Sequence, residues 1–241
     1  GPACAHLGEL YMTGVGTQTD YKKAQSLFKE ACKAKDQYGC FIEGDLYYNG
    51  FGVERDYSVA KAKYSKGCQL GYTQACVKLG TMYELGKGIS LDYKKANELY
   101  GDACAKKDGD GCFNLARMHA GGLGVQSSAP IAFAMYSTLC SAGDQRGCLG
   151  MATLYEKGLG VSQNLDMAVS LYEGACGFGY AKACTNLGSL LLHTSDFKDP
   201  VEGLEFVKKG CDLGDAKGCV ELGVVYYEGV AGEIGQTIAK N

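Results

Sequence analysis

Paired cysteines are the residues in this chain whose type and spacing point most directly to chemistry. The 241 residues include 13 cysteines, and 12 of these form six pairs in which the second cysteine follows the first by eight residues. Successive pairs start 36 residues apart, with one final step of 35. Thiols in such pairs can form disulfides, hold a metal ion or fill a core as small hydrophobic side chains. The pairs are Cys32 and Cys40, Cys68 and Cys76, Cys104 and Cys112, Cys140 and Cys148, Cys176 and Cys184, and Cys211 and Cys219.

Disulfide formation explains this pattern better than the two alternatives. Structural zinc sites favour ligands about two to four residues apart with further Cys or His nearby, whereas the chain has wider gaps and only His6, His119 and His193 as histidines. A residue that only fills a core has no reason to recur as a doublet. The pattern therefore predicts six local disulfides, a secreted or periplasmic location, and no metal or cofactor. Cys4 has the register of a second cysteine without a first, so we expect a free or intermolecular thiol there.

Each bridge requires a turn between two helices. Eight residues of continuous helix span about 12 Å, at about 1.5 Å per residue, whereas the Cα atoms of a disulfide lie about 4.4–6.8 Å apart. The first cysteine must therefore end one helix and the second must open the next. Glycine supplies the left-handed conformation of the turn in most repeats. Lys35 and Lys107 replace this glycine in two repeats, and we expect those two turns to close differently.

The repeat contains two helices, which we call the A and B helices. A B helix begins after a capping residue and carries a small residue, an aromatic residue and the first cysteine at intervals of four, so that they share one face. An A helix begins near the second cysteine, carries Leu-Gly and Tyr on one face, and ends at a Gly-x-Gly turn. The period predicts a solenoid of stacked units, here with seven A and six B helices. The predicted capping residues are Asp20, Asp56, Asp92, Ser128, Asn164 and Asp199.

Three stretches depart from the repeat. Residues 191–196 have lost the Gly-x-Gly turn and one residue, and we expect the solenoid to bend differently there. Residues 235–241 align with the start of a further B helix, and we expect this tail to fray or to pack on a neighbouring molecule. Gly1 and Pro2 have the character of a cleaved expression tag. Residues 3–241 are then expected to form a single solenoid that is a piece of a longer precursor.

The motifs of this repeat resemble a known family. Asp-Tyr-Lys-Lys-Ala, Leu-Tyr and Ala-Cys between Asp92 and Cys104, with Leu-Gly, Tyr and Gly-x-Gly-Ile between Cys76 and Ile89, resemble the Sel1-like repeat, a relative of the tetratricopeptide repeat. With its cysteine pairs, residues 4–229 are similar to the Helicobacter cysteine-rich protein family. The resemblance implies an all-α fold, a right-handed α/α superhelical solenoid of disulfide-stapled helix pairs. It also implies export, contact with host or envelope partners, and β-lactamase or penicillin-binding activity as described for some members.

Catalytic motifs bear on the last of these implications. Serine β-lactamases need Ser-x-x-Lys, Ser-Asp-Asn and Lys-Thr-Gly. The chain has Ser-x-x-Lys at Ser26, Ser58 and Ser195 but neither of the other motifs, which favours a binding scaffold over a weak hydrolase. Binding of a peptidoglycan fragment or a β-lactam is the alternative. The net charge of −3 provides no basic surface for nucleic acid, and no apolar run is long enough to span a membrane.

A site for a protein or extended peptide is predicted on the A helices, at positions two, five and nine after the second cysteine. Core positions repeat because stacking demands one shape, so we expect these variable, mostly polar positions to face solvent. The resemblance places them on the concave side, where Asn can pair with a peptide backbone and Arg can fork onto a carboxylate. An ordinary solvated surface is the alternative, and Arg117→Ala and Asn186→Ala should each weaken binding about tenfold without lowering the melting temperature. The candidates are Asn114, Arg117, Asn186, Ser189, Lys78 and Asp45.

Overall fold

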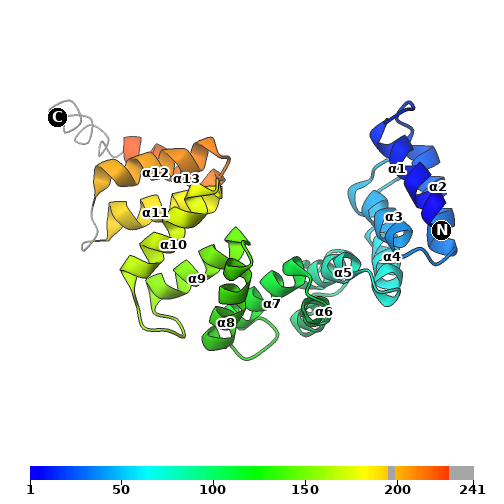
Figure 1. The fold of residues 1–241 in the computed structure, drawn as a ribbon. Helices are drawn as coiled ribbons and strands as arrows, with labels where there is room; N and C mark the ends of the chain where they lie inside the picture. The colour runs from blue at the N-terminus through cyan, green and yellow to red at the C-terminus, as the bar shows by residue number, and fades with distance from the viewer. Residues whose placement is uncertain (195–198, 228–241) are drawn as a thin grey trace. The chain divides into compact units, whose positions relative to one another are not determined.

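The structure, a computed structural model, describes residues 1–194 and 199–227, and these contain thirteen helices and no strand (Figure 1). Seven of the helices are A helices and six are B helices, as the repeat predicts. The A helices are α1 (Pro2–Thr13), α3 (Gln37–Asn49), α5 (Thr73–Leu85), α7 (Gly109–Gly121), α9 (Gln145–Lys157), α11 (Ala181–His193) and α13 (Ala216–Tyr227). The B helices are α2 (Tyr21–Lys33), α4 (Tyr57–Gln69), α6 (Tyr93–Ala105), α8 (Ala129–Ser141), α10 (Leu165–Gly177) and α12 (Pro200–Asp212).

The chain divides into two compact units. Unit 1 comprises residues 1–128 with helices α1 to α7, and unit 2 comprises residues 129–241 with helices α8 to α13. Within each unit every helix packs against the next one in the sequence, and successive A helices also touch, as α5 does α7 and α11 does α13. Neighbour-on-neighbour packing of this kind is the defining feature of a helical solenoid.

All six predicted disulfides are present. Each joins the last turn of a B helix to the first turn of the following A helix, with Cα–Cα distances of 4.4–4.7 Å. Each A helix with a bridge begins three residues before its cysteine, so that both cysteines of a pair lie inside helices. Cys4 is the free cysteine of the described residues, and it is half-buried.

The turns between bridged cysteines share one conformation. Gly71, at φ 102°, donates its N–H to the carbonyl of Cys68 at 2.9 Å. Lys35 and Lys107 adopt the same left-handed region, at φ 59° and 63°, and Lys35 N–H donates to the carbonyl of Cys32 at 3.1 Å. The expectation that the two lysine turns close differently is therefore wrong. Because the bridge holds both ends of the turn together, lysine accepts a conformation that costs an L-residue about 1–2 kcal/mol.

Short polar side chains start both kinds of helix. At the B helices, five of the predicted caps accept a backbone N–H of the first turn: Asp20, Asp56, Asp92, Asn164 and Asp199. The A helices α3, α7 and α9 are capped in the same way by Asp36, Asp108 and Asp144. These A-helix caps were not predicted, although an aspartate four residues before the second cysteine is their signal in the sequence.

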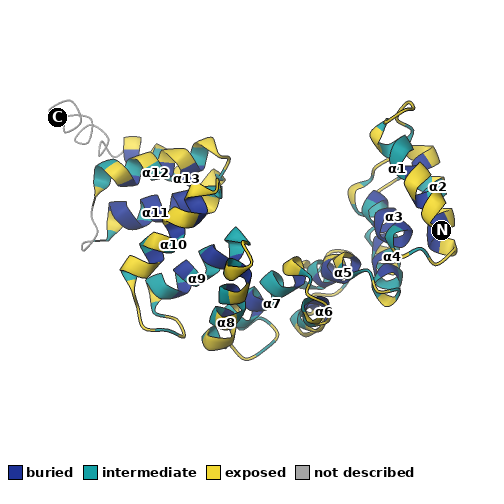
Figure 2. Cartoon of the chain, in the orientation of Figure 1, coloured by how far each residue is buried: buried dark blue, intermediate teal, exposed yellow. Residues whose placement is uncertain are grey.

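In each helix pair of unit 1, an aromatic ring of the B helix packs on a glycine of the A helix. Tyr64, Tyr100 and Tyr172 of the B helices are fully buried, and every described helix contributes buried residues to this core (Figure 2). A Cβ atom added at Gly80 would lie 2.8 Å from the Tyr100 ring, and one added at Gly44 would lie 2.7 Å from the Tyr64 ring. The small residue is therefore required because it lets the aromatic ring reach the backbone of the preceding A helix.

The tyrosine near the end of each A helix is less buried than the repeat pattern predicts. Tyr47 and Tyr83 are half-buried, and Tyr226 of α13 is 57% exposed. Polar partners explain why these rings stay partly exposed. Gln25 Nε2 donates to Tyr47 Oη at 3.2 Å, and Lys61 Nζ lies 6.0 Å from the centre of the Tyr83 ring. These rings cover the core with one edge and keep the hydroxyl near water.

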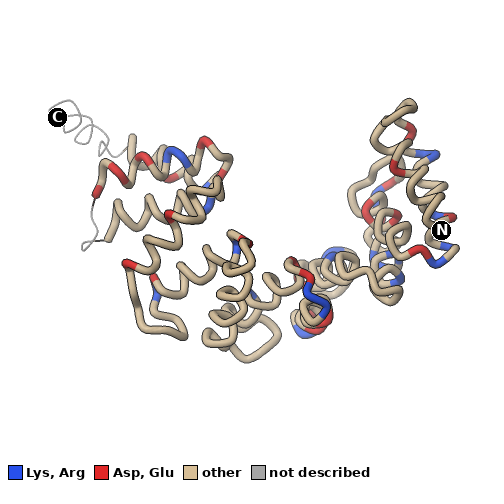
Figure 3. The backbone as a smooth tube through the Cα atoms, in the orientation of Figure 1, with Lys and Arg blue, Asp and Glu red and all other residues tan. Residues whose placement is uncertain are grey.

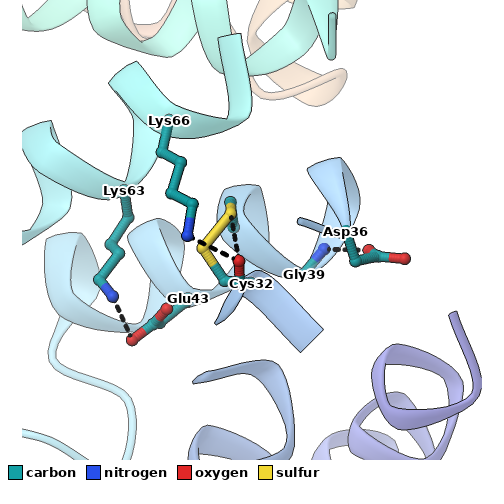
Figure 4. Close-up of a disulfide and its surroundings, with 7 residues drawn as sticks. Cys32, Asp36, Gly39, Glu43, Lys63 and Lys66 are labelled. Atoms are coloured by element: carbon teal, nitrogen blue, oxygen red, sulfur yellow. Dashed lines mark hydrogen bonds and ion pairs between the residues drawn. A yellow bond between two sulfur atoms is a disulfide. The ribbon is translucent and has the colours of Figure 1, made fainter. Parts of the chain in front are cut away.

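One charged residue occupies a core position beside the first disulfide (Figure 4). Glu43 lies where other repeats have leucine or methionine, and its side chain is 1% exposed. Lys63 of α4 reaches it with an N–O distance of 2.9 Å, and Lys66 of the same helix donates to the carbonyl of Cys32 at 2.8 Å. A buried carboxylate is tolerated only when paired, so these two lysines tie α4 to the bridged end of α2 and to α3.

Candidate functional site

Three of the predicted partner-binding residues, Asp45, Arg117 and Ser189, are part of a hydrogen-bonded layer that connects the repeats. At position five after the second cysteine, every described side chain from α1 to α11 is half-buried and bonded to another repeat or helix. The expectation that this position faces solvent freely is therefore wrong. The pairs are Glu9 with Tyr38, Asp45 with Tyr64, Thr81 with Tyr100, Arg117 with Glu84, Thr153 with Tyr172, and Ser189 with Glu221.

Position nine fits the prediction, whereas position two is mixed. The side chains at position nine from α1 to α11 are all exposed. At position two, Lys78 is exposed and Asn114 is half-buried, but Ile42 is only 8% exposed. A partner would meet position nine directly and would meet positions two and five only at the polar atoms that remain open.

Unit 1 contains a four-residue polar cluster, Thr81, Glu84, Tyr100 and Arg117, which we call the unit 1 cluster. Tyr100 Oη of α6 donates to Glu84 Oε2 of α5 at 2.9 Å and lies 3.1 Å from Thr81 Oγ1. Arg117 of α7 places one guanidinium nitrogen 2.7 and 2.6 Å from the two oxygens of Glu84. Glu84 is 13% exposed and Arg117 is 37% exposed, so the ion pair lies at the rim of the core. Burial, with the Glu84 carboxylate beside it, raises the pKa of Tyr100.

Unit 2 contains the same arrangement two repeats later, which we call the unit 2 cluster: Thr153, Glu156, Tyr172 and Ser189. Tyr172 Oη of α10 donates to Glu156 Oε2 of α9 at 2.6 Å and lies 3.1 Å from Thr153 Oγ1. Ser189 takes the register of Arg117, but its hydroxyl donates to Glu221 Oε2 of α13 at 2.5 Å. Burial and the neighbouring Glu156 raise the pKa of Tyr172.

The two asparagines among the candidates flank these clusters. Asn186 of α11 lies beside the hydroxyl of Tyr172 and opposes the rise in its pKa, and its Oδ1 accepts from Lys217 Nζ at 3.4 Å. Asn114 of α7 has the equivalent register in unit 1 and is half-buried. An amide in this place offers both a donor and an acceptor to a segment lying along the A helices.

The last two candidates, Asp45 and Lys78, form a separate group in unit 1. Asp45 Oδ1 accepts from Tyr64 Oη at 2.5 Å. Burial raises the pKa of Asp45, while the Tyr64 hydrogen bond and the charge of Lys78 oppose that rise. Lys78 is exposed and remains open to a partner.

The sequence analysis missed the carboxylates and buried tyrosines of both clusters. Glu84 and Glu156 lie eight residues after the second cysteine of their repeats, a position that no single repeat distinguishes. The available signal was the recurrence of Thr-x-x-Glu at Thr81 and Thr153, 72 residues apart, followed in each case by the B-helix tyrosine.

The residues that resemble hydrolase motifs are not gathered into a site. Ser26 and Ser58 are exposed on α2 and α4, and no described side chain bonds to either hydroxyl. Ser195 lies outside the described residues. His119 is half-buried at the tyrosine position of α7, and its Nδ1 has no hydrogen-bond partner within the described part of the chain. The alternative of β-lactam or peptidoglycan chemistry thus finds no support in this arrangement.

Metal-binding clusters and membrane-spanning helices are both absent from the described residues. No group of three or more His, Cys, Asp or Glu side chains there is placed to hold a metal ion. Over residues 1–194 and 199–227, none of the helices combines the length and apolar character needed to cross a membrane.

Comparison with known proteins agrees with the repeat architecture. The family model described as the Sel1 repeat matches residues 1–36, 37–72, 73–108, 109–144, 145–176 and 181–215. No curated protein matches the chain.

Solved structures with the same fold come from several bacteria. The protective antigen c5321 of uropathogenic Escherichia coli strains, which displays an SLR fold, is 25% identical with a TM-score of 0.78 over 94% of this chain. The chain spans 49% of that protein's length. A Sel1 repeat protein from Oxalobacter formigenes is 23% identical with a TM-score of 0.79, covering 87% of this chain and 84% of its own. Helicobacter pylori cysteine rich protein B is 30% identical over 54% of this chain and 93% of its own, with a TM-score of 0.44.

Proposed function

We propose that this chain, which belongs to the Sel1 repeat family, binds an extended segment of a partner protein along its A helices. The fold of that family serves protein interaction. In this proposal the concave side of the solenoid is the binding surface. Asn114 in unit 1 and Asn186 in unit 2 each hydrogen-bond the backbone of a segment bound to their own unit, and position nine contributes side-chain contacts. The observation that carries the proposal is the recurrence of a half-buried asparagine beside a Tyr–Glu pair in both units.

A hydrogen-bonded layer accompanies the asparagines in both units. Tyr100 and Tyr172 are fully buried, and each is bonded to a carboxylate and a threonine of the preceding A helix. Recognition groups held on rigid helices by a hydrogen-bonded second layer lose little conformational entropy on binding. Fixed amides along a solenoid suit an extended peptide, whose backbone presents donors and acceptors at regular intervals.

The proposed place of action is outside the cytoplasm. Six disulfides suggest an oxidising compartment, extracellular or periplasmic. We place the protein there as an exported scaffold whose partners are host or envelope proteins.

Asparagine substitutions test the surface. The oxidised protein is used to select peptides from a random library, and one selected peptide carrying a fluorescent label is titrated by anisotropy. Asn114→Ala and Asn186→Ala should each weaken the affinity about tenfold, or about 1.4 kcal/mol. Arg117→Ala is a poorer probe than the sequence indicated, because it also breaks the ion pair with Glu84.

Lys94→Ala is the matched control, since Lys94 is exposed on the B helix α6. It should leave the affinity unchanged, and all three variants should melt at the wild-type temperature. Equal binding by wild type and both asparagine variants would contradict the proposal, as would a selection that enriches no peptide.

A further inference from the structure

The unit 1 and unit 2 clusters differ at one position, and that difference identifies a chemical group missing from unit 2. Glu84 and Glu156 occupy equivalent places, as do Tyr100 and Tyr172, and Thr81 and Thr153. In unit 1 the guanidinium of Arg117 forms an ion pair with the Glu84 carboxylate, with N–O distances of 2.7 and 2.6 Å. In unit 2 the equivalent residue is Ser189, which is too short to take that role.

Glu156 consequently has an open oxygen. Its Oε2 accepts the hydrogen bond from Tyr172, and no lysine or arginine of the described residues pairs with its carboxylate. Ser189 bonds instead to Glu221, a second carboxylate that also lies 3.3 Å from His193 Nε2. Neither Ser189 nor a lysine or arginine of the described residues thus takes the role at Glu156 that Arg117 has at Glu84.

The charge of the two units matches this difference. Residues 1–128 contain 16 Lys and Arg against 14 Asp and Glu, whereas residues 129–241 contain 8 against 13. Figure 3 shows the charged residues of the described part of each unit. An acidic unit attracts a cationic segment over a range of about 8–10 Å at physiological salt.

We propose that Glu156, with Tyr172 and Asn186, receives an arginine side chain of the bound partner segment, in the place that Arg117 fills in unit 1. This inference rests on the proposed function and specifies the partner: a segment with arginine at the position that meets α9 and α11. Glu156 accepts the guanidinium, and Tyr172 holds the carboxylate from the opposite side. Asn186 and Ser189 border the site.

Arginine fits this place better than lysine does. The guanidinium is planar, always charged and weakly hydrated, and it presents several N–H groups to a carboxylate in a fixed geometry. Arg117 demonstrates the fit in this same fold, because one of its nitrogens bonds both oxygens of Glu84. An ammonium nitrogen could make the same contact but would lose more hydration at a half-buried carboxylate.

The test uses a blocked tripeptide, acetyl-Gly-Arg-Gly-amide, titrated into the oxidised full chain and followed by NMR of labelled tyrosine and glutamate side chains. The arginine peptide should shift the Tyr172 and Glu156 signals in a saturable way. The lysine peptide should bind several-fold more weakly, and the citrulline peptide, which is uncharged, should leave these signals unshifted. Equal shifts by the arginine and citrulline peptides would overturn the inference.

Two exchanges between the units provide matched controls. Ser189→Arg should fill the site internally and abolish the shifts at Glu156. In Glu156→Gln the Tyr172 signal should report an affinity weaker by about tenfold or more. Arg117→Ser should open the equivalent site in unit 1, so that Tyr100 and Glu84 signals now shift as well. Retention of the Glu156 shifts in Ser189→Arg would overturn the proposal.

This experiment separates the inference from the proposed function. The tripeptide reports on the arginine site whether or not a longer peptide has been selected. If it fails to bind while Asn186→Ala still weakens a selected peptide, the A helices bind partners without this arginine specificity. If it binds at Glu156 while the library enriches nothing, the arginine site stands and the extended-segment surface is rejected.

Discussion

Unit 1 and unit 2 hold the same polar cluster two repeats apart, but an arginine completes it in unit 1 alone. The threonine, carboxylate and tyrosine repeat because they join a B helix to the A helix before it in both units. The fourth residue differs because its partner differs: Arg117 bonds Glu84, and Ser189 bonds Glu221. A position that varies between repeats is therefore not necessarily free of structural contacts.

The comparison separates features that both units share from features that belong to one. Shared features, such as the disulfides and the packing of an aromatic ring or valine on glycine, should respond alike to perturbation. Features found in one unit, such as the arginine ion pair and the lysine turns, should respond in that unit alone. The following predictions run from the largest expected effect to the smallest.

Reduction should weaken both units to the same extent, because each contains three bridges. Each bridge closes a short loop and contributes about 2–3 kcal/mol, so that three approach the whole stability of a typical domain of about 5–15 kcal/mol. Hydrogen exchange measured separately for the helices of each unit, with and without reductant, checks this. Loss of hydrogen-exchange protection in only one unit would show that the disulfides of the two units contribute unequally to stability.

Alanine at the packing glycine should destabilise both units, with the larger cost in unit 2. Gly80→Ala places a Cβ 2.8 Å from the Tyr100 ring and should cost about 1–3 kcal/mol. Gly188→Ala places a Cβ 2.6 Å from the backbone oxygen of Gly203, which cannot move without shifting α12, so its cost should be greater. Urea denaturation of both variants measures the difference, and Gly174→Ala, which meets no described atom within 4 Å, is the control.

Neutralising the cluster carboxylate should affect unit 1 more than unit 2. Glu84→Gln leaves Arg117 without its charged partner and should cost about 1–2 kcal/mol, a value reduced because Arg117 is partly exposed. Glu156→Gln retains an acceptor for Tyr172 and should change the free energy of unfolding by less than about 0.5 kcal/mol. Chemical denaturation decides the matter, and equal losses for the two variants would mean that Glu156 has an ion-pair partner of its own.

Glycine in the lysine turn of unit 1 should stabilise the protein slightly. Lys35→Gly removes the cost of a left-handed lysine but increases the freedom of the unfolded chain, for a net gain of about 0.5 kcal/mol. Gly71→Lys, the reverse change in the next turn, should lose a similar amount. Melting temperatures of the two variants measured together provide the check. A loss of stability in Lys35→Gly would indicate that the lysine side chain contributes contacts of its own.

The architecture could be predicted from the sequence because its causes are local and repeated. Cys32 and Cys40 specify a turn, Asp20 specifies a helix start, and the recurrence of each in later repeats removes the ambiguity that a single instance leaves. Membership of the family follows from the same repetition. The lysine turns were predicted wrongly because the low preference of lysine for a left-handed backbone does not include the constraint that the disulfide imposes on Lys35.

The candidate site was predicted less well, for a physical reason. Its contacts join residues from three successive helices, and the sequence shows neither which tyrosine hydroxyl meets which carboxylate nor how deeply each lies. Arg117 and Ser189 were chosen as hydrogen-bonding types on an exposed surface, but both are tied into the layer between repeats. Of the bend predicted over residues 191–196, residues 195 and 196 lie outside the described part of the chain, as does the whole tail predicted over residues 235–241.

The local placement of the disulfides bears on how the twelve bridged cysteines find their partners among thirteen thiols. A protein with this many thiols has a very large number of possible pairings, and most of them would trap the chain. Here each correct partner follows only eight residues behind in synthesis, and at about 5–20 residues per second the second thiol emerges within roughly two seconds of the first. A loop of this length closes in about 10–100 ns, so each thiol meets the one eight residues away far more often than it meets a distant one. Pairing can then proceed one repeat at a time, in the order in which the chain appears.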